Sequence, residues 1–412
     1  MEHDGPWPDG PLPVPLDGST LLEAAGATGV LDVRSFRLCE VNQFGWRDAE
    51  HLRAVQFEPA ADYHAEYRPV GILWLRLWRY TWETASFPRK FRLYFDTVRG
   101  SDQHLLASLP AGLQIQPLIS YDIAGQKVSW HGAEGSPLLE WNASDEIRPH
   151  LHPVTSPDGR VLTADVPRDH IWHHGLMLGW TDVESPGRGT EPYIFWGEPN
   201  AGQLRPHQPR DWQHGPVWSG FRQQVDWCSR DGRQIFSSDV GLRYSKIEKV
   251  YDWIDIDLKI SAGPSPVEFK SEYGHLTFRM NLAFQDGALV TPEGRLHDVD
   301  MIAAKAVPWI GFDGLLDGRP AGVLLLNDPG NPCGLPSGDG SCTLRDFILD
   351  QGDLFAWLGM NPFRLQPQLL QPGESLSFRY RLVLTNRKLD EALVNLMVRG
   401  VTTSPVVTWA IE

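Results

Sequence analysis

Hydrophobic and polar residues alternate along two long segments of the chain. Residues 254–260 place isoleucine or leucine at every second position, with Asp or Lys between them, and residues 376–384 repeat the alternation. Since successive side chains of a β-strand point to opposite faces, a period of two predicts two strands that each bury one face. The Pro-Gly-Glu sequence at 372–374 predicts a turn into the second strand.

Shorter segments near the N-terminus carry the same signal. Residues 35–41 and 91–96 alternate, and residues 71–75 form a denser apolar strand. They predict a small β-sandwich that ends near residue 105, followed by a linker over residues 101–120 that includes a first strand. The 39 Gly and 33 Pro residues fit many short strands and turns.

Helical signals are few. Leu389, Leu393, Leu396 and Met397 follow helical spacing before Gly400, and a short helix is predicted at 21–25 with Ser19 or Thr20 as its cap. No strand–helix–strand alternation and no internal repeat is present. The sequence therefore predicts an all-β protein of two antiparallel β-sandwich domains, at residues 1–105 and 106–412, with one C-terminal helix.

Composition narrows the classes of partner. The 412 residues carry 37 basic and 52 acidic side chains, a net charge of −15, which argues against nucleic acid as a partner. No apolar run has the length of a membrane helix, and the N-terminus lacks the pattern of a signal peptide, so we expect a cytoplasmic protein. No glycine-rich phosphate motif is present, so a nucleotide cofactor is not expected.

The four cysteines do not form a disulfide framework. Cys39 and Cys228 have the pattern of core residues. Cys333 and Cys342 flank a Gly-rich loop that would bring them within disulfide or metal reach, but two reduced thiols are the favoured interpretation.

The densest group of chemically active residues lies between Arg148 and His174. Five of the 14 histidines fall in these 27 positions. Neutral imidazole is both a metal ligand and an acid/base group near neutral pH. On a strand His150 and His152 would share a face, and on a helical turn His170 would lie beside His173 or His174. Each histidine alone fits a packed core residue, but several neighbouring imidazoles favour a functional site.

The cluster supplies candidates for three roles. Acid/base catalysis is assigned to His170, His173 or His174, with Asp169 orienting an imidazole. A divalent metal ion is the candidate cofactor, although the spacing matches no zinc signature. The candidate metal ligands are His152, His170 and His174.

Other candidates would bind substrate. Glu272 would supply a carboxylate, and Asp328 ends an apolar strand, although an Asp before Pro commonly makes a turn. The remaining substrate-binding candidates are a guanidinium and three indole rings, namely Arg148, Trp172, Trp180 and Trp196.

Motifs spread over residues 145–386 resemble the DUF6807 family, which is also labelled the PmoA or methane oxygenase family. The motifs follow in this order: Arg148-Pro149 with His152-Pro153; Asp169-His170 with His173-His174-Gly175; Gly179-Trp180; Phe195-Trp196; Glu272-Tyr273-Gly274; Asp328-Pro329; Asn331-Pro332; Asn361-Pro362-Phe363; Pro372-Gly373-Glu374. The family's Asn/Asp-His-Pro turn appears here as Asn327-Asp328-Pro329, without the histidine. The resemblance implies that the larger domain is a sandwich like the supersandwich of mutarotase-like proteins. The N-terminal region resembles accessory sandwich domains of carbohydrate-active enzymes.

Three functions are compatible with these residues. The first is a carbohydrate-active enzyme (a hydrolase, lyase or epimerase) that acts on a small-molecule or oligosaccharide ligand through the His/Asp cluster. The 17 tryptophans fit this interpretation, because indole rings stack on sugars. The second is a carbohydrate-binding protein without catalysis. The third is a metal-dependent oxidoreductase, because histidine clusters suit copper or iron.

Overall fold

The computed structural model describes most of the chain, and the following account concerns only residues 10–41, 47–77, 90–98, 117–132, 134–186, 192–197, 202–247, 251–270, 274–296, 305–332, 342–344, 357–364 and 367–402. The chain divides into two compact units, one of residues 1–116, 214–218 and 395–412 and one of residues 117–213 and 219–394. The predicted domain boundary at residue 105 and most of the predicted linker lie outside the described residues.

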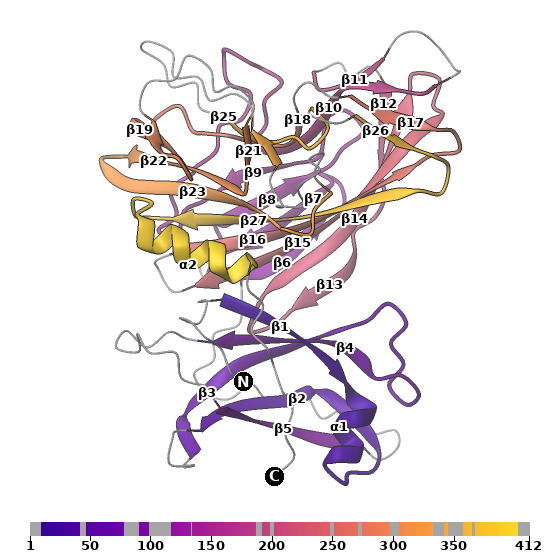
Figure 1. The fold of residues 1–412 in the computed structure, drawn as a ribbon, viewed down its shortest axis with the longest axis vertical. Helices are drawn as coiled ribbons and strands as arrows, with labels where there is room; N and C mark the ends of the chain where they lie inside the picture. Colours follow the sequence, from indigo (N-terminus) through magenta and orange to yellow (C-terminus); the bar gives the residue numbers. More distant parts are fainter. Residues whose placement is uncertain are drawn as a thin grey trace. The chain divides into compact units, whose positions relative to one another are not determined.

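The described part of the first unit contains one five-stranded antiparallel sheet in the order β1-β4-β3-β2-β5 (Figure 1). Its strands are β1 (Gly10–Asp17), β2 (Val30–Val41), β3 (Arg47–Pro59), β4 (Val70–Leu77) and β5 (Lys90–Val98). All five strands contribute to one core, in which Phe36 contacts Phe57 and Phe95. The strands predicted at 35–41, 71–75 and 91–96 are therefore confirmed.

A short helix, α1 (Gly18–Ala24), follows β1. The cap differs from the prediction, because Asp17 accepts hydrogen bonds from the backbone N–H groups of Ser19 and Thr20 at 2.9 and 3.4 Å. An Asp side chain at this position satisfies N–H groups that have no partner inside the helix. The two residues predicted as caps are thus the donors to the cap.

The second unit contains two larger sheets among its described residues. The twelve-stranded sheet runs in the order β21-β24-β25-β18-β10-β9-β8-β7-β6; β11 and β17 also pair with β10, and β26 pairs with β17. Its strands are β6 (Leu118–Asp122), β7 (Lys127–His131), β8 (Pro137–Asn142), β9 (His150–Val154), β10 (Leu176–Glu184), β11 (Tyr193–Phe195), β17 (Val267–Phe269), β18 (Gly274–Arg279), β21 (Lys305–Val307), β24 (Cys342–Leu344), β25 (Trp357–Met360) and β26 (Gln368–Leu370).

The ten-stranded sheet has the order β12-β14-β15-β16-β27-β23-β22-β19-β20, with β13 beside β14. Its strands are β12 (Gly202–Pro206), β13 (Arg210–His214), β14 (Ser219–Ser229), β15 (Gln234–Ile247), β16 (Tyr251–Ala262), β19 (Gln285–Thr291), β20 (Gly294–Leu296), β22 (Trp309–Leu316), β23 (Arg319–Asn327) and β27 (Ser375–Thr385).

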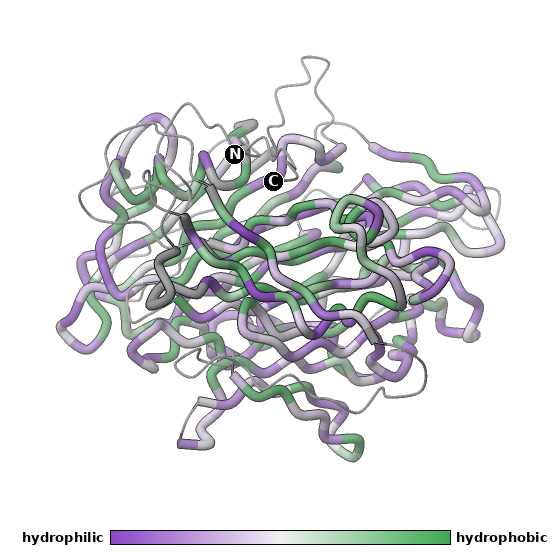
Figure 2. Tube along the Cα trace, turned by 90° about the horizontal axis from the view of Figure 1, so that it is seen from below, coloured by the Kyte–Doolittle hydropathy of each residue, from purple (hydrophilic) through white to green (hydrophobic). Residues whose placement is uncertain are grey.

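The two strands with the clearest alternation, β16 and β27, are direct neighbours. Ile256 lies opposite Tyr380 and Leu258 opposite Phe378, and all four side chains are buried in the main core. Figure 2 shows hydrophobic and hydrophilic residues alternating along several parts of the trace. The predicted all-β class is confirmed.

The main core lies between the two large sheets, because both supply its residues. Buried polar atoms are hydrogen-bonded across it: the indole N–H of Trp141 on β8 donates to Gln223 on β14 at 2.6 Å, and His275 Nε2 on β18 lies 2.9 Å from the Tyr380 hydroxyl on β27. Since an unpaired buried polar group destabilises a fold, these bonds stabilise the packing of the two sheets against each other.

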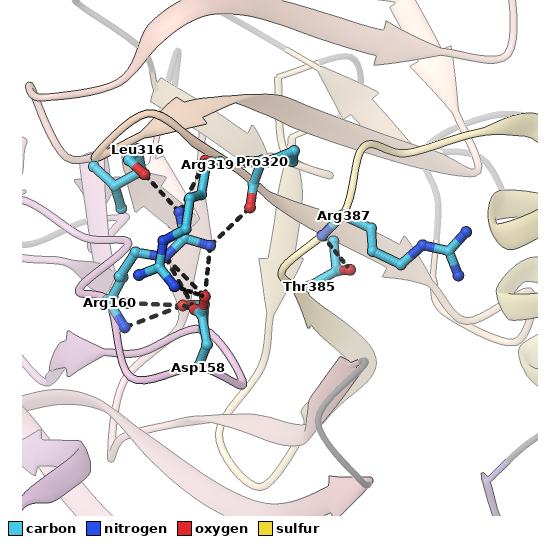
Figure 3. Close-up of polar contacts among 8 residues, drawn as sticks. Asp158, Arg160, Leu316, Arg319, Pro320, Thr385 and Arg387 are labelled. Atoms are coloured by element: carbon cyan, nitrogen blue, oxygen red, sulfur yellow. Dashed lines mark hydrogen bonds and ion pairs between the residues drawn. The ribbon is translucent and has the colours of Figure 1, made fainter.

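Arg160 joins the loop after β9 to the hairpin between β22 and β23 (Figure 3). Its guanidinium forms an ion pair with Asp158 at 3.0 Å and donates to the carbonyls of Leu316, Arg319 and Pro320 at 2.6 to 2.8 Å. Arg160 is 7% exposed, so water screens these bonds little. The contact anchors the start of the segment that carries the histidine cluster.

The predicted C-terminal helix is α2 (Glu391–Thr402), and it begins after Asp390, whose side chain accepts from the Leu393 N–H at 2.8 Å. Across the described chain, no helix has the length and apolarity needed to cross a bilayer. Cys39 and Cys228 are buried, as expected of core thiols. Cys333 and the side chain of Cys342 lie outside the described residues.

Candidate functional site

The histidine cluster lies on the face of the twelve-stranded sheet that does not contact the main core. On β9, β10 and β18, residues such as Leu151, Leu178 and Phe278 belong to the core, and the alternate residues point the other way. We call the face formed by these alternate residues the polar face: His150, His152, Met177, Thr277 and Arg279. The predicted sharing of one strand face by His150 and His152 is realised on β9.

Residues 164–175 fold back beside this face. Asp165 and His174 form an antiparallel bridge, the N–H of Val166 donates to the His173 carbonyl at 2.9 Å, and that of Gly175 to the Ala164 carbonyl at 2.8 Å. Gly175 has φ of 43°, and a Cβ there would lie 2.0 Å from the Leu151 carbonyl oxygen. Only glycine therefore allows this segment to approach β9 so closely.

The bridge brings a carboxylate and two imidazoles together. His174 Nδ1 lies 2.6 Å from Asp165 Oδ1, and the rings of His174 and His150 lie 4.8 Å apart. His150 Nδ1 faces the Arg148 carbonyl at 2.8 Å. Ligand atoms of His150, Asp165 and His174 all lie within 4.8 Å of one another, so we call these residues the His150 triad.

Burial lowers the pKa of two imidazoles at this site. It lowers the pKa of His150 to about 4, against the opposing effect of the Arg148 carbonyl. Burial also lowers the pKa of His152, whose Nδ1 lies 2.9 Å from the Thr163 hydroxyl. Burial raises the pKa of Asp165, but the hydrogen bond from His174 outweighs it, and the net pKa is lowered. At neutral pH His150 and His152 are therefore neutral, and Asp165 is ionised.

A second chain of contacts runs from Arg279 to His170. The Arg279 side chain is 0% exposed and pairs with Asp169 Oδ2 at 2.5 Å, and the same oxygen lies 2.9 Å from His170 Nδ1. The net pKa of Asp169 is lowered, because the His170 hydrogen bond and the Arg279 charge outweigh burial. An ionised Asp169 thus holds the Nδ1 atom of a half-exposed imidazole.

The His173 ring packs against the His170 ring. Their rings stack at 4.7 Å and 14°, and Trp196 and Trp357 lie 5.8 and 5.5 Å from the His173 ring. Burial lowers the pKa of His173 to about 2, and the positive charge of Arg279 adds to the effect. His173 is therefore a neutral packing residue that supports His170, while His174 belongs to the His150 triad.

Arg148 is fully buried beside the second group. Its guanidinium donates to the Trp172 carbonyl and lies 5.0 Å from the centre of the Trp196 ring. Gly179 makes room for it, since a Cβ there would lie 2.7 Å from Arg148 Nη1. Arg148 therefore positions the backbone at Trp172 and the ring of Trp196.

Two predicted substrate-binding residues have other roles in the described structure, and a third is not described. Trp180 is 0% exposed in the main core, where it packs on Trp227 and Phe236, so its ring does not face a ligand. Asp328 accepts from the N–H of Gly330 at 2.8 Å, which is the turn role. Glu272 lies outside the described residues.

The predicted metal-ligand set is divided between two groups. His174 belongs to the His150 triad, whereas His170 bonds to Asp169 and stacks on His173. The described residues offer His150 and Asp165 as partners of His174 instead.

Sequence reasoning missed Asp165, Arg279 and Trp357. The first two could have been found from a spacing of two, because residues two apart on an extended segment point to the same face. Asp165 follows Thr163 at this spacing, and Arg279 follows Thr277. Trp357 reaches the cluster because β25 pairs with β18, a long-range contact with no local signal.

Comparison with known proteins places the chain in a family. Residues 128–398 match DUF6807, a family of unknown function, and the chain belongs to it. No curated protein is significantly similar to the chain in sequence.

Likeness to solved structures is weak. The GH36 α-galactosidase AgaB of Geobacillus stearothermophilus is 11% identical with a TM-score of 0.36, over 66% of this chain and 41% of that one. The polysaccharide lyase BACCELL_00875 is 10% identical with a TM-score of 0.31, over 69% of this chain and 34% of that one. A putative aldose 1-epimerase of Klebsiella pneumoniae is 13% identical with a TM-score of 0.36, over 67% of this chain and 82% of that one. The chain thus spans less than half the length of the α-galactosidase and of the lyase.

Proposed function

We propose that this protein is a carbohydrate-active enzyme in which His170 transfers a proton to or from a sugar. The observation that carries the proposal is the contact chain from buried Arg279 through Asp169 to His170. A carboxylate that holds one ring nitrogen leaves the other nitrogen of a half-exposed imidazole as an acid/base group.

Aromatic surface beside His170 supports sugar as the substrate class. The Trp172 ring lies 5.3 Å from the His170 ring at 77° and is only partly buried. An indole ring exposes a broad apolar face on which the C–H face of a sugar can pack. Because His173 and Trp196 pack behind these two rings, their positions are fixed before a ligand arrives.

The reaction class follows from proton transfer. Hydrolysis needs an acid for the leaving oxygen, whereas elimination and epimerisation need a base for a carbon-bound or hydroxyl proton. A single imidazole oriented by a carboxylate can serve either role near neutral pH, so the test must cover all three reactions.

The experiment is a screen of untagged protein against aryl glycosides, uronate-containing oligosaccharides and free aldoses. Hydrolysis is measured by the phenol released from the aryl glycoside. Elimination is measured by the absorbance of the unsaturated product, and epimerisation by NMR. His170→Gln should lower turnover on the order of a hundredfold or more, as removal of an acid/base group does. The matched control is His207→Gln, because His207 also pairs with a carboxylate, that of Asp226 at 2.9 Å. His207 is half exposed and directly follows β12, outside the histidine cluster.

Each outcome has a meaning. Turnover lost with His170→Gln and kept with His207→Gln supports the proposal. Turnover that survives His170→Gln contradicts the role of His170. Sugar binding without turnover of any class would contradict an enzyme and favour a carbohydrate-binding protein.

A further inference from the structure

The His150 triad has the composition of a metal site. Two imidazoles and one carboxylate form a mixed nitrogen and oxygen donor set, which suits divalent first-row transition metals such as zinc, iron and cobalt. Calcium and magnesium prefer oxygen ligands alone. The carboxylate of Asp165 supplies an anionic oxygen donor, which a divalent cation favours.

We propose that His150, Asp165 and His174 bind one divalent first-row transition metal ion.

The backbone holds the three ligands in place without a metal. Asp165 and His174 face each other in a bridge, and His150 on β9 pairs in register with Met177 on β10, three residues after His174. The ligands thus come from one sheet and from the segment docked on it, as a preorganised site requires. Ligand atoms on one zinc ion lie about 3.4 Å apart, so the group, now within 4.8 Å, needs only a small contraction.

The hydrogen bonds around the triad fit a ligand role. Because His150 Nδ1 faces a carbonyl oxygen, it carries the hydrogen, and the lone pair is on Nε2. A backbone carbonyl on the second ring nitrogen is a common support of metal-binding histidines. His174 Nδ1 lies 2.6 Å from Asp165 Oδ1, so this imidazole and this carboxylate are already side by side.

Three protein donors leave at least one further position on a first-row ion for water or a substrate oxygen. His152 is two residues along β9 from His150 and lies on the same face. The proposal is independent of the acid/base role of His170, because its test reads metal rather than activity.

The test uses untagged, chelator-treated protein titrated with Co²⁺, followed by visible absorption, with Zn²⁺ as the competitor. We expect about one ion per chain. Asp165→Asn and His150→Gln should each weaken binding on the order of tenfold or more, since even supporting residues contribute that much. His207→Gln, which removes the histidine of another His–Asp pair, should leave binding unchanged.

The variants also separate a lost ligand from a lost fold. Asp165 is a third exposed, so Asp165→Asn should melt at nearly the wild-type temperature without metal. Wild-type protein that binds no stoichiometric Co²⁺ or Zn²⁺ would overturn the proposal. Binding that survives both substitutions in the folded variants, or that disappears with His207→Gln, would overturn it as well.

Discussion

Asp169 contacts both a buried cation and a half-exposed imidazole through the same oxygen, Oδ2, which lies 2.5 Å from Arg279 and 2.9 Å from His170. Buried Arg279 holds the Asp169 carboxylate in place, and the carboxylate holds the His170 ring in place. This relationship ties the proposed acid/base group to the sheet, since Arg279 is the last residue of β18.

A double-mutant cycle tests that tie. Asp169→Asn should lower the free energy of unfolding by about 1–3 kcal/mol, because buried Arg279 loses this carboxylate. Arg279→Met combined with Asp169→Asn should cost less than the sum of the two single changes, with a coupling of about 1 kcal/mol or more. Urea denaturation measures all four proteins, and strict additivity would show that the pair is not coupled.

Gly175→Ala should destabilise the protein strongly. A Cβ at φ of 43° would lie 2.0 Å from the Leu151 carbonyl, so we expect a loss of about 3 kcal/mol or more from strain and overlap together. Gly159→Ala is the control, because Gly159 has φ of 86° and open space around its Cβ position. It should lose only about 1–2 kcal/mol. Equal losses in urea denaturation would contradict the close approach.

Stability should fall as the pH falls, in part through His275. Burial lowers the pKa of His275 from 6.5 to about 3, so below the first value the unfolded chain binds a proton that the folded chain does not. The contribution of neutral His275 to stability is therefore complete above pH 6.5. It is lost as the pH falls from 6.5 toward about 3. Near about pH 5 the slope is about 1.3 kcal/mol per pH unit.

His275→Gln should remove this part of the slope. The side chain packs between Phe363 and Phe378 and bonds to Tyr380, so the variant will be less stable at every pH. The difference between variant and wild type, measured by urea denaturation, should shrink as the pH falls from about 7 to about 5. A difference that stays constant would show that His275 does not titrate in this way.

Two tryptophans predicted as sugar platforms should behave differently. Trp172→Ala should weaken the binding of a sugar ligand by about three- to tenfold, because its partly buried ring is beside His170. Trp180→Phe should lower stability but leave affinity unchanged, because Trp180 is inside the main core. Calorimetric titration of both variants with one sugar from the screen distinguishes them, and the reverse order would contradict the placement of the site.

The sequence predicted the strands better than the site. Strands β16 and β27 could be predicted because hydrophobic and polar residues alternate along them. This alternation depends only on neighbouring positions in the sequence. The histidine cluster was found by composition, yet its division into two groups was not. That division depends on the bridge between Asp165 and His174 and on the positive φ of Gly175, which join positions nine or more residues apart. The proximity of Trp357 depends on strand order, which no local pattern records.

Hydrogen–deuterium exchange with and without a bound sugar tests the central claim most directly, because it shows where on the chain the ligand acts. The account predicts slower exchange in peptides that cover residues 164–177, where His170 and Trp172 lie, with little change in peptides from residues 10–77 of the first unit. Protection confined to the first unit, with none in residues 164–177, would contradict the assignment of His170 and Trp172 to the working site.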